Sequence, residues 1–191
     1  MLDLYASPPK DGEVICFDEC GPLELRPIHG VVWARKKHPN RLRATYNRYN
    51  GTEQLLAFYD VHGDCLTGQV RKRKTVSDLI PVFKRLRRCY PIDKRLYIVM
   101  DNLSSHYNSK LQQYLRDNNM EPVWTPTYAS WLNAIEAHFG PLKRFTLHNS
   151  DDTSHKNRRS RIYRYLTWRN TQRRGNTSPL YKFRYIKLDE H

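Results

Sequence analysis

Two short apolar segments of this chain each end on an acid. Asp18 follows the run Val14–Phe17, and Asp101 follows the run Leu96–Met100. Apolar runs this brief, bounded by turn-forming residues, indicate buried strands. A carboxylate at the end of a buried strand is costly unless it is paired or binds a cation. The two acids therefore predict a shared metal site.

A third acid completes the pattern. We expect a helix over residues 131–145, in which Leu132, Ile135 and Phe139 recur at helical spacing. Glu136 falls on that same apolar face, so we expect its carboxylate to point toward the sheet. Mg²⁺ prefers oxygen ligands. Two such ions about 3.5–4 Å apart can hold the attacking and leaving oxygens of a phosphodiester.

Four polar residues could support this site. Glu19 follows Asp18 directly, so it should point to the opposite face of the strand as a supporting neighbour. Asn102 and His106 come just after the second acid. His106 either hydrogen-bonds beside the site, or contacts the scissile phosphate, or caps the loop. Asn133 is expected to cap or orient the helix that carries the third acid.

The order of elements constrains how these residues can meet. The first seventy residues read as an antiparallel meander, and helices then alternate with strands, which predicts an α/β fold with a mixed sheet flanked by helices. This order resembles the ribonuclease H-like arrangement. The expected strands cover residues 14–17, 30–35, 41–49, 54–61, 65–70, 96–100 and 123–124. The expected helices begin at Ser77 or Asp78, with Pro81 in the first turn, and then cover 109–118, 131–145 and 155–170.

Composition narrows the class of partner. The chain has 191 residues and a net charge of +14, which indicates a polyanionic partner such as nucleic acid. Residues 141–191 hold 13 Lys and Arg against 4 Asp and Glu, a surplus of 9. No apolar run approaches the roughly 20 residues of a membrane span, no signal peptide precedes the first strand, and the four cysteines read as reduced thiols. The candidate DNA-binding residues are Arg71, Lys72, Arg73, Lys74, Lys143, Arg144, Arg158, Arg159 and Arg161.

Three stretches resemble the catalytic domain of mariner-type transposases. They are "CFDECGPL", "IVMDNLSSH" and "PTYASWLNAIEAHFGPLKR", with 82 residues between the first two acids and 34 between the last two. The closest resemblance is to the bacterial insertion-sequence branch, and it covers about residues 13–170. Where that family has Asn-Pro-Ile-Glu, this chain has Asn133-Ala134-Ile135-Glu136. The alanine should soften the entry into the helix while leaving the carboxylate in place.

The resemblance implies a five-stranded ribonuclease H-like fold of the D-D-E type. Asp18, Asp101 and Glu136 would be the catalytic metal ligands, holding two Mg²⁺ ions for which Mn²⁺ could substitute. The activity would be strand cleavage and strand transfer at transposon ends, with insertion at a TA dinucleotide, by a homodimer located in the bacterial cytoplasm with the nucleoid. We expect an N-terminal linker over 1–12, the catalytic domain over 13–170 and a basic tail over 171–191. A helix-turn-helix region would be missing or on a separate chain.

Two other functions remain open at this point. One is a non-catalytic nucleic-acid-binding domain that has decayed or been repurposed, against which the three intact acids argue. The other is a different ribonuclease H-like nuclease, against which the stretch from Tyr128 to Glu136 argues.

Overall fold

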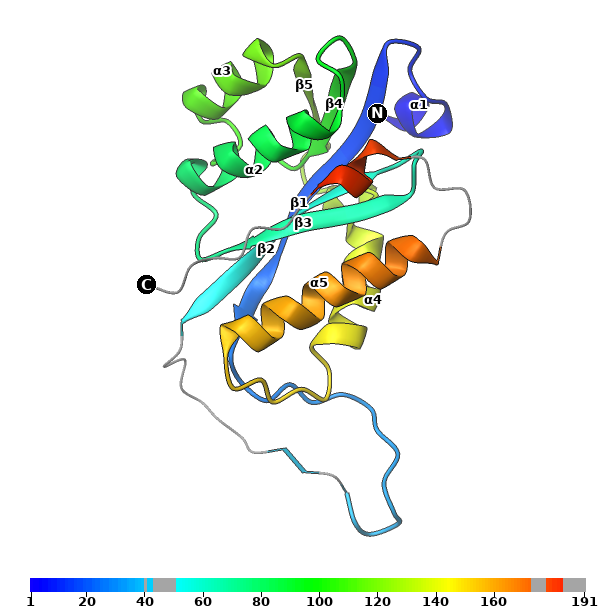
Figure 1. The fold of residues 1–191 in the computed structure, drawn as a ribbon, viewed down its shortest axis with the longest axis vertical. Helices are drawn as coiled ribbons and strands as arrows, with labels where there is room; N and C mark the ends of the chain where they lie inside the picture. Colours follow the sequence, from blue (N-terminus) through cyan, green and yellow to red (C-terminus); the bar gives the residue numbers. More distant parts are fainter. Residues whose placement is uncertain (40, 43–50, 173–177, 184–191) are drawn as a thin grey trace.

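The computed structural model describes residues 1–39, 41–42, 51–172 and 178–183. Its centre is a mixed five-stranded sheet in the order β3-β2-β1-β4-β5 (Figure 1). β1 pairs antiparallel with β2, and β2 with β3, whereas β1, β4 and β5 run parallel. The strands are β1 (Gly12–Glu24), β2 (Thr52–Asp60), β3 (Cys65–Arg71), β4 (Arg95–Met100) and β5 (Met120–Trp124). The predicted fold class is confirmed.

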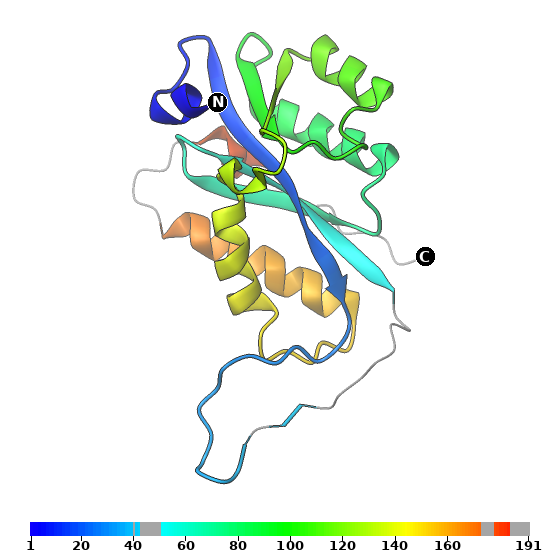
Figure 2. The ribbon, with the colours of Figure 1, turned by 180° about the vertical axis from the view of Figure 1, so that it is seen from behind.

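Helices cover both faces of the sheet, as Figures 1 and 2 show from opposite sides. One face carries α2 (Val76–Cys89), α3 (Ser109–Asp117) and the short 3-10 turn η2 (Pro179–Lys182). The other carries α1 (Leu2–Ala6), α4 (Glu136–Thr146) and α5 (His155–Thr171). A 3-10 turn, η1 (Ser130–Leu132), leads into α4. None of the described helices is both long and apolar enough to cross a bilayer.

The central strand β1 explains why two separate apolar clusters form. Ile15 and Phe17 pack into the cluster under α2 and α3, while Val14 and Cys16 pack into the cluster under α4 and α5. Successive side chains of a strand point to opposite faces, so a strand covered on both sides reads as a continuous apolar run. This is why the start of β1 was recognisable from the sequence.

The expected strand over 30–35 is wrong. This segment belongs to an extended loop that runs away from the sheet beyond the end of β1 (Figure 1). Val31 and Trp33 are fully exposed there. Strand propensity reflects how well a side chain fits a half-buried pleated surface, and among the described residues no strand pairs with this loop. The expected strand over 41–49 falls largely outside the described residues.

The start of α2 also differs from the expectation. Thr75 is the cap. The backbone N–H of Thr75 donates to the carboxylate of Asp78 at 3.4 Å, and the hydroxyl of Thr75 donates to the same carboxylate at 2.6 Å. Pro81 is the sixth residue of the helix and not part of the first turn. A proline there removes one intrahelical hydrogen bond. Burial of Leu79, Val82 and Phe83 in the core offsets that loss.

The single helix expected over 131–145 is interrupted. Asn133 has an extended backbone conformation after η1, and α4 begins at Glu136. Glu136 is therefore the first residue of the helix, exposed to solvent, whereas Ile135 and Phe139 are buried. The expectation that Glu136 lies on the buried stripe is wrong, because Leu132 does not belong to the same helical turn series. The helix continues through Pro141 to Thr146.

Candidate active site

Parallel pairing of β1 with β4 brings the first two acids together. The last paired residues are Cys16 and Val99, so the same register carried two residues further places Asp18 beside Asp101. Asp18 is still within β1, paired with Ala57 on its other side, while Asp101 directly follows the end of β4. The two carboxylates therefore meet at one edge of the parallel part of the sheet.

Asn133 places the third acid at the same edge. Its side chain is fully buried, and its amide Nδ2 donates to the carbonyl oxygen of Phe17 at 2.9 Å. The backbone N–H of Glu136 in turn bonds to the carbonyl of Asn133 at 3.0 Å. The amide thus fastens the start of α4 to the residue before Asp18. Asn133 orients this helix rather than capping it, because the cap position is Ile135.

The pKa of Asp18 responds to its burial and to the two other carboxylates. Burial raises the pKa of Asp18 to about 7, opposed by a hydrogen bond from the backbone N–H of Glu19. The negative charges of Glu136 and Asp101 raise the pKa of Asp18 further. An acid this strongly perturbed in a cluster of like charges is typical of functional sites.

His106 joins Asp101 to Glu19 across the sheet. Its ring is fully buried, with Nδ1 3.0 Å from Asp101 Oδ1 and Nε2 3.0 Å from Glu19 Oε1. Burial opposes the imidazolium charge, but hydrogen bonds to Asp101 and Glu19 outweigh it and raise the pKa of His106 to about 9. The hydrogen bond from His106 holds the pKa of Asp101 below its ordinary value. His106 therefore keeps Asp101 ionised and oriented.

The polar neighbours lie largely where the sequence placed them. Glu19 lies on the opposite face of β1 from Asp18, with Lys74 Nζ 3.6 Å from Glu19 Oε2. Asn102 Nδ2 donates to the carbonyl of Thr125 at 2.8 Å, which joins the loop after β4 to the end of β5. These contacts fix the loops around the acids without making either side chain a fourth member of the carboxylate group.

Tyr5 is a member of the site that the sequence did not reveal. Its hydroxyl donates to the carbonyl of Leu132 at 3.0 Å, accepts from the backbone N–H of Ala134 at 3.3 Å and lies 3.3 Å from Cys16 Sγ. It thereby braces the segment between η1 and α4 against β1. The prolines and Asp-Gly that follow suggested only a loop here, and a five-residue helix leaves almost no periodic signal.

The three acids suit a hard divalent cation, because their carboxylates would offer only oxygen atoms as ligands. Within the described ranges, no three His, Cys, Asp or Glu side chains already stand at the spacing of a shared metal site. Glu136 is exposed at the first turn of α4. A cation would relieve the repulsion among Asp18, Asp101 and Glu136 that raises the pKa of Asp18.

The basic residues fall into two groups. Arg158 is fully buried and ion-paired to Asp152 at 3.0 Å, so the expectation that it lines the outer surface is wrong. Arg159 pairs with Glu53 and Arg161 with Asp152, each at 2.6 Å. By contrast, the exposed candidates are Lys72, Arg73, Lys74, Lys143 and Arg144, with Arg71 half-buried.

Two aromatic side chains in the segment that leads to Glu136 are open to solvent. Tyr128 is 92% exposed and Trp131 is 73% exposed.

Solved structures with the same fold define the class to which this domain belongs. The Mos1 strand transfer complex matches with a TM-score of 0.65 at 16% identity, over 97% of this chain and 59% of that one. The Mos1 mariner paired end complex with Mg gives 0.62 at 16% identity, over 92% and 57%. The HTLV-2 integrase catalytic core domain in complex with magnesium gives 0.56 at 12% identity, over 91% and 96%. The chain therefore has the ribonuclease H-like fold that these transposase and integrase structures share.

The family is shown by the sequence as well. A family described as DDE superfamily endonuclease matches residues 13–158. The chain belongs to that family. No curated protein matches it. The chain spans about three fifths of the length of the Mos1 chains that it matches.

Proposed function

We propose that this chain is the catalytic domain of a DNA transposase, cleaving DNA strands and joining them to a target with divalent metal ions. The observation that carries the proposal is the convergence of Asp18, Asp101 and Glu136 from β1, β4 and α4 on one edge of the sheet. Membership of the DDE endonucleases supports the same conclusion.

The three carboxylates would hold the metal. Bound Mg²⁺, or Mn²⁺ in its place, would activate the attacking oxygen and stabilise the leaving oxygen at the phosphodiester, with two ions per site. Asp101 enters this set already ionised, because His106 hydrogen-bonds to it. Asp18 has a pKa of about 7 and would ionise fully when a cation is near. Asn133 and Tyr5 hold the start of α4 in place.

The finer assignments rest on the resemblance and on the solved neighbours. We place the chain in the bacterial insertion-sequence branch, acting in the cytoplasm on transposon ends and target DNA. A homodimer is proposed because two ends must be held together, and the integrase core among the neighbours is described as dimeric. Lys143 and Arg144 follow Glu136 on α4 and remain exposed, so they are the best placed of the candidate DNA contacts.

The test is Asp101→Asn, assayed by nicking of supercoiled plasmid with Mg²⁺ or Mn²⁺. We expect nicking to be abolished, because the amide cannot replace an anionic ligand. DNA affinity measured in EDTA should stay equal or rise, since a negative charge is lost. Asp117→Asn, at an exposed acid on α3, is the matched control and should nick like the wild type.

Crystals soaked in Mn²⁺ give an independent readout. We expect anomalous density between the three carboxylates of the wild type and none in Asp101→Asn. Nicking that survives in Asp101→Asn would refute the enzyme assignment. DNA binding by the wild type with no nicking in either metal would favour the non-catalytic nucleic-acid-binding domain instead.

A further inference from the structure

Three aromatic rings gather on the outer surface where α4 and α5 pack together. Phe145 of α4 lies 5.7 Å from Tyr165 and 5.8 Å from Trp168 of α5, between ring centroids. Tyr165 and Trp168 are 5.9 Å apart. Phe145 is 62% exposed and Trp168 is 50% exposed. Large aromatic rings left this open in a cluster mark a contact surface rather than a part of the core.

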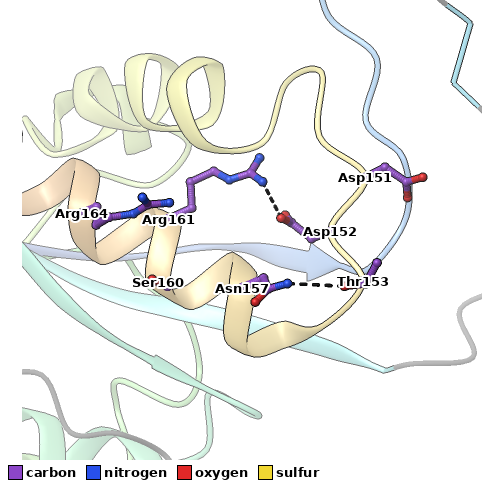
Figure 3. A pocket seen from close by; sticks show the side chains of 7 residues that line it. All are labelled: Asp151, Asp152, Thr153, Asn157, Ser160, Arg161 and Arg164. Atoms are coloured by element: carbon purple, nitrogen blue, oxygen red, sulfur yellow. Dashed lines mark hydrogen bonds and ion pairs between the residues drawn. The ribbon is translucent and has the colours of Figure 1, made fainter.

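The cluster continues along α5 as a basic stripe. Arg161, Tyr165 and Trp168 lie four and seven residues apart, with Arg164 beside them, so they share one face of the helix. The stripe ends in an open hollow of about 410 Å³ between the first half of α5 and the segment that precedes the helix (Figure 3). The hollow is lined by Asp151, Asp152, Thr153, Asn157, Ser160, Arg161 and Arg164.

The charges of the stripe are unevenly satisfied. Arg161 is turned toward Asp152, to which it is paired, as Figure 3 shows. Arg164 is exposed and makes no ion pair with the residues the structure describes. Asp151 at the rim is the one exposed acid of the lining. An anion would therefore be held on the Arg164 side of the hollow, next to the rings.

The helices themselves carry no acid on this surface. α5 contains no Asp or Glu in its 17 residues, and α4 contains none after Glu136. A second copy of this chain would present the same positive surface and would be repelled. Three rings also offer far less than the roughly 1,000 Å² that a stable protein interface buries. The matching partner is an anion that also offers flat apolar faces. Unpaired nucleic acid bases meet both conditions, because base faces are hidden inside a duplex.

We propose that this stripe binds single-stranded nucleic acid, with bases stacked on Trp168 and Phe145 and the phosphate backbone beside Arg164. The inference goes beyond the proposed function, since it needs neither metal nor the three acids. Phe145 lies nine residues along α4 from Glu136, about 13 Å at the helical rise. Nine residues are also about two and a half turns, so Phe145 faces the side of α4 opposite Glu136, and a strand on the stripe would be held apart from the carboxylates.

The first test measures fluorescence anisotropy of a labelled dT12 strand and of a 12-bp duplex, in EDTA so that no cleavage occurs. Trp168→Leu and Phe145→Leu should each weaken single-strand binding at least about 5-fold, the lower end of what one stacked base contributes. Trp168→Phe keeps an aromatic face and should bind nearly as the wild type. Both leucines keep apolar bulk at exposed positions, and thermal melting by circular dichroism checks that the variants fold.

The second test concerns the phosphates. Arg164→Ala should reduce the slope of log affinity against log salt for dT12 by about 0.7, the value for one single-strand phosphate contact. Arg116→Ala, at an exposed arginine on α3, is the matched control and should leave the slope unchanged.

Three results would overturn the inference. One is dT12 affinity that is the same in Trp168→Leu and in the wild type. Another is duplex binding that depends on Trp168 as strongly as single-strand binding does. The third is a change of oligomeric mass in Trp168→Leu with unaltered dT12 affinity, which would make this surface a contact between copies.

Discussion

Asp18 and Asp101 are neighbours of the same residue type, yet their pKa values move in opposite directions. Asp18 is buried beside two other carboxylates, which raises its pKa to about 7. Asp101 accepts a hydrogen bond from His106, which lowers its pKa. The difference lies in which partner each acid meets across the sheet. The sequence predicted that the acids would meet, but it could not assign His106 to Asp101, because that contact depends on how the loop after β4 folds back.

Asp18→Asn should stabilise the metal-free protein at alkaline pH. The folded-state pKa of about 7 lies above the ordinary value of 3.8. The proton on Asp18 therefore stabilises the folded state. Its contribution to the free energy of unfolding is fully present below pH 3.8 and is lost as the pH rises through 7. Asparagine carries no charge to bury, so the free energy of unfolding of the variant should not fall in this way as the pH rises. Each unit of pKa difference corresponds to about 1.4 kcal/mol, so the expected gain at pH 8 is at most a few kcal/mol.

Urea unfolding in EDTA at pH 5 and pH 8 measures this effect. The wild type should lose more unfolding free energy between the two pH values than Asp18→Asn does. Asp93→Asn, at an exposed acid, should follow the wild type. Parallel pH dependence in the wild type and Asp18→Asn would show that Asp18 is not buried among like charges. Added Mn²⁺ should raise the stability of the wild type alone, because only a folded ligand set binds it.

Among the elements, two of the helices were predicted to within one residue at each end. α3 and α5 were expected over 109–118 and 155–170, and the structure has them over Ser109–Asp117 and His155–Thr171. The start of α4 was missed because a polar contact decides it. The backbone of Asn133 is extended rather than helical, and its side chain donates to the carbonyl of Phe17, which is 116 residues away in the sequence. A local pattern cannot contain such information.

Tyr5→Phe should slow strand cleavage while leaving DNA affinity unchanged. The ring keeps its packing, but the segment before Glu136 loses the hydroxyl that bonds to Leu132 and Ala134. Loss of a group that orients a metal ligand typically costs roughly 10-fold to 100-fold in activity. The stability cost should be about 1 kcal/mol, as for one hydrogen bond.

The measurement is single-turnover nicking alongside urea unfolding. Tyr181→Phe is the matched control, because it removes a hydroxyl that bonds to the carbonyl of Asn170 at the end of α5. It should lower stability by a similar amount without affecting nicking. If both variants nick alike, Tyr5 contributes only to general stability.

For the molecule as a whole, net charge predicted a polyanionic partner but not which cations face it. Four arginines of α5 are ion-paired within the fold: Arg158 and Arg161 to Asp152, Arg159 to Glu53 and Arg169 to Asp64. Glu53 is 106 residues away from its partner. Breaking a buried ion pair typically costs several kcal/mol. We therefore expect Arg158→Ala to lower the free energy of unfolding, in addition to any effect on DNA binding.

The core on each face of the sheet draws on residues beyond the stretch that matches the family. That match ends at residue 158, inside α5. Ile162 and Leu166 still follow in one apolar cluster, and Leu180 and Phe183 in the other. The stretch that matches the family is thus shorter than the stretch that forms the folded core. A protein cut after residue 158 would retain every acid of the site and yet leave part of the apolar cluster on each side of the sheet uncovered, so we expect it to aggregate rather than to act as a smaller nuclease.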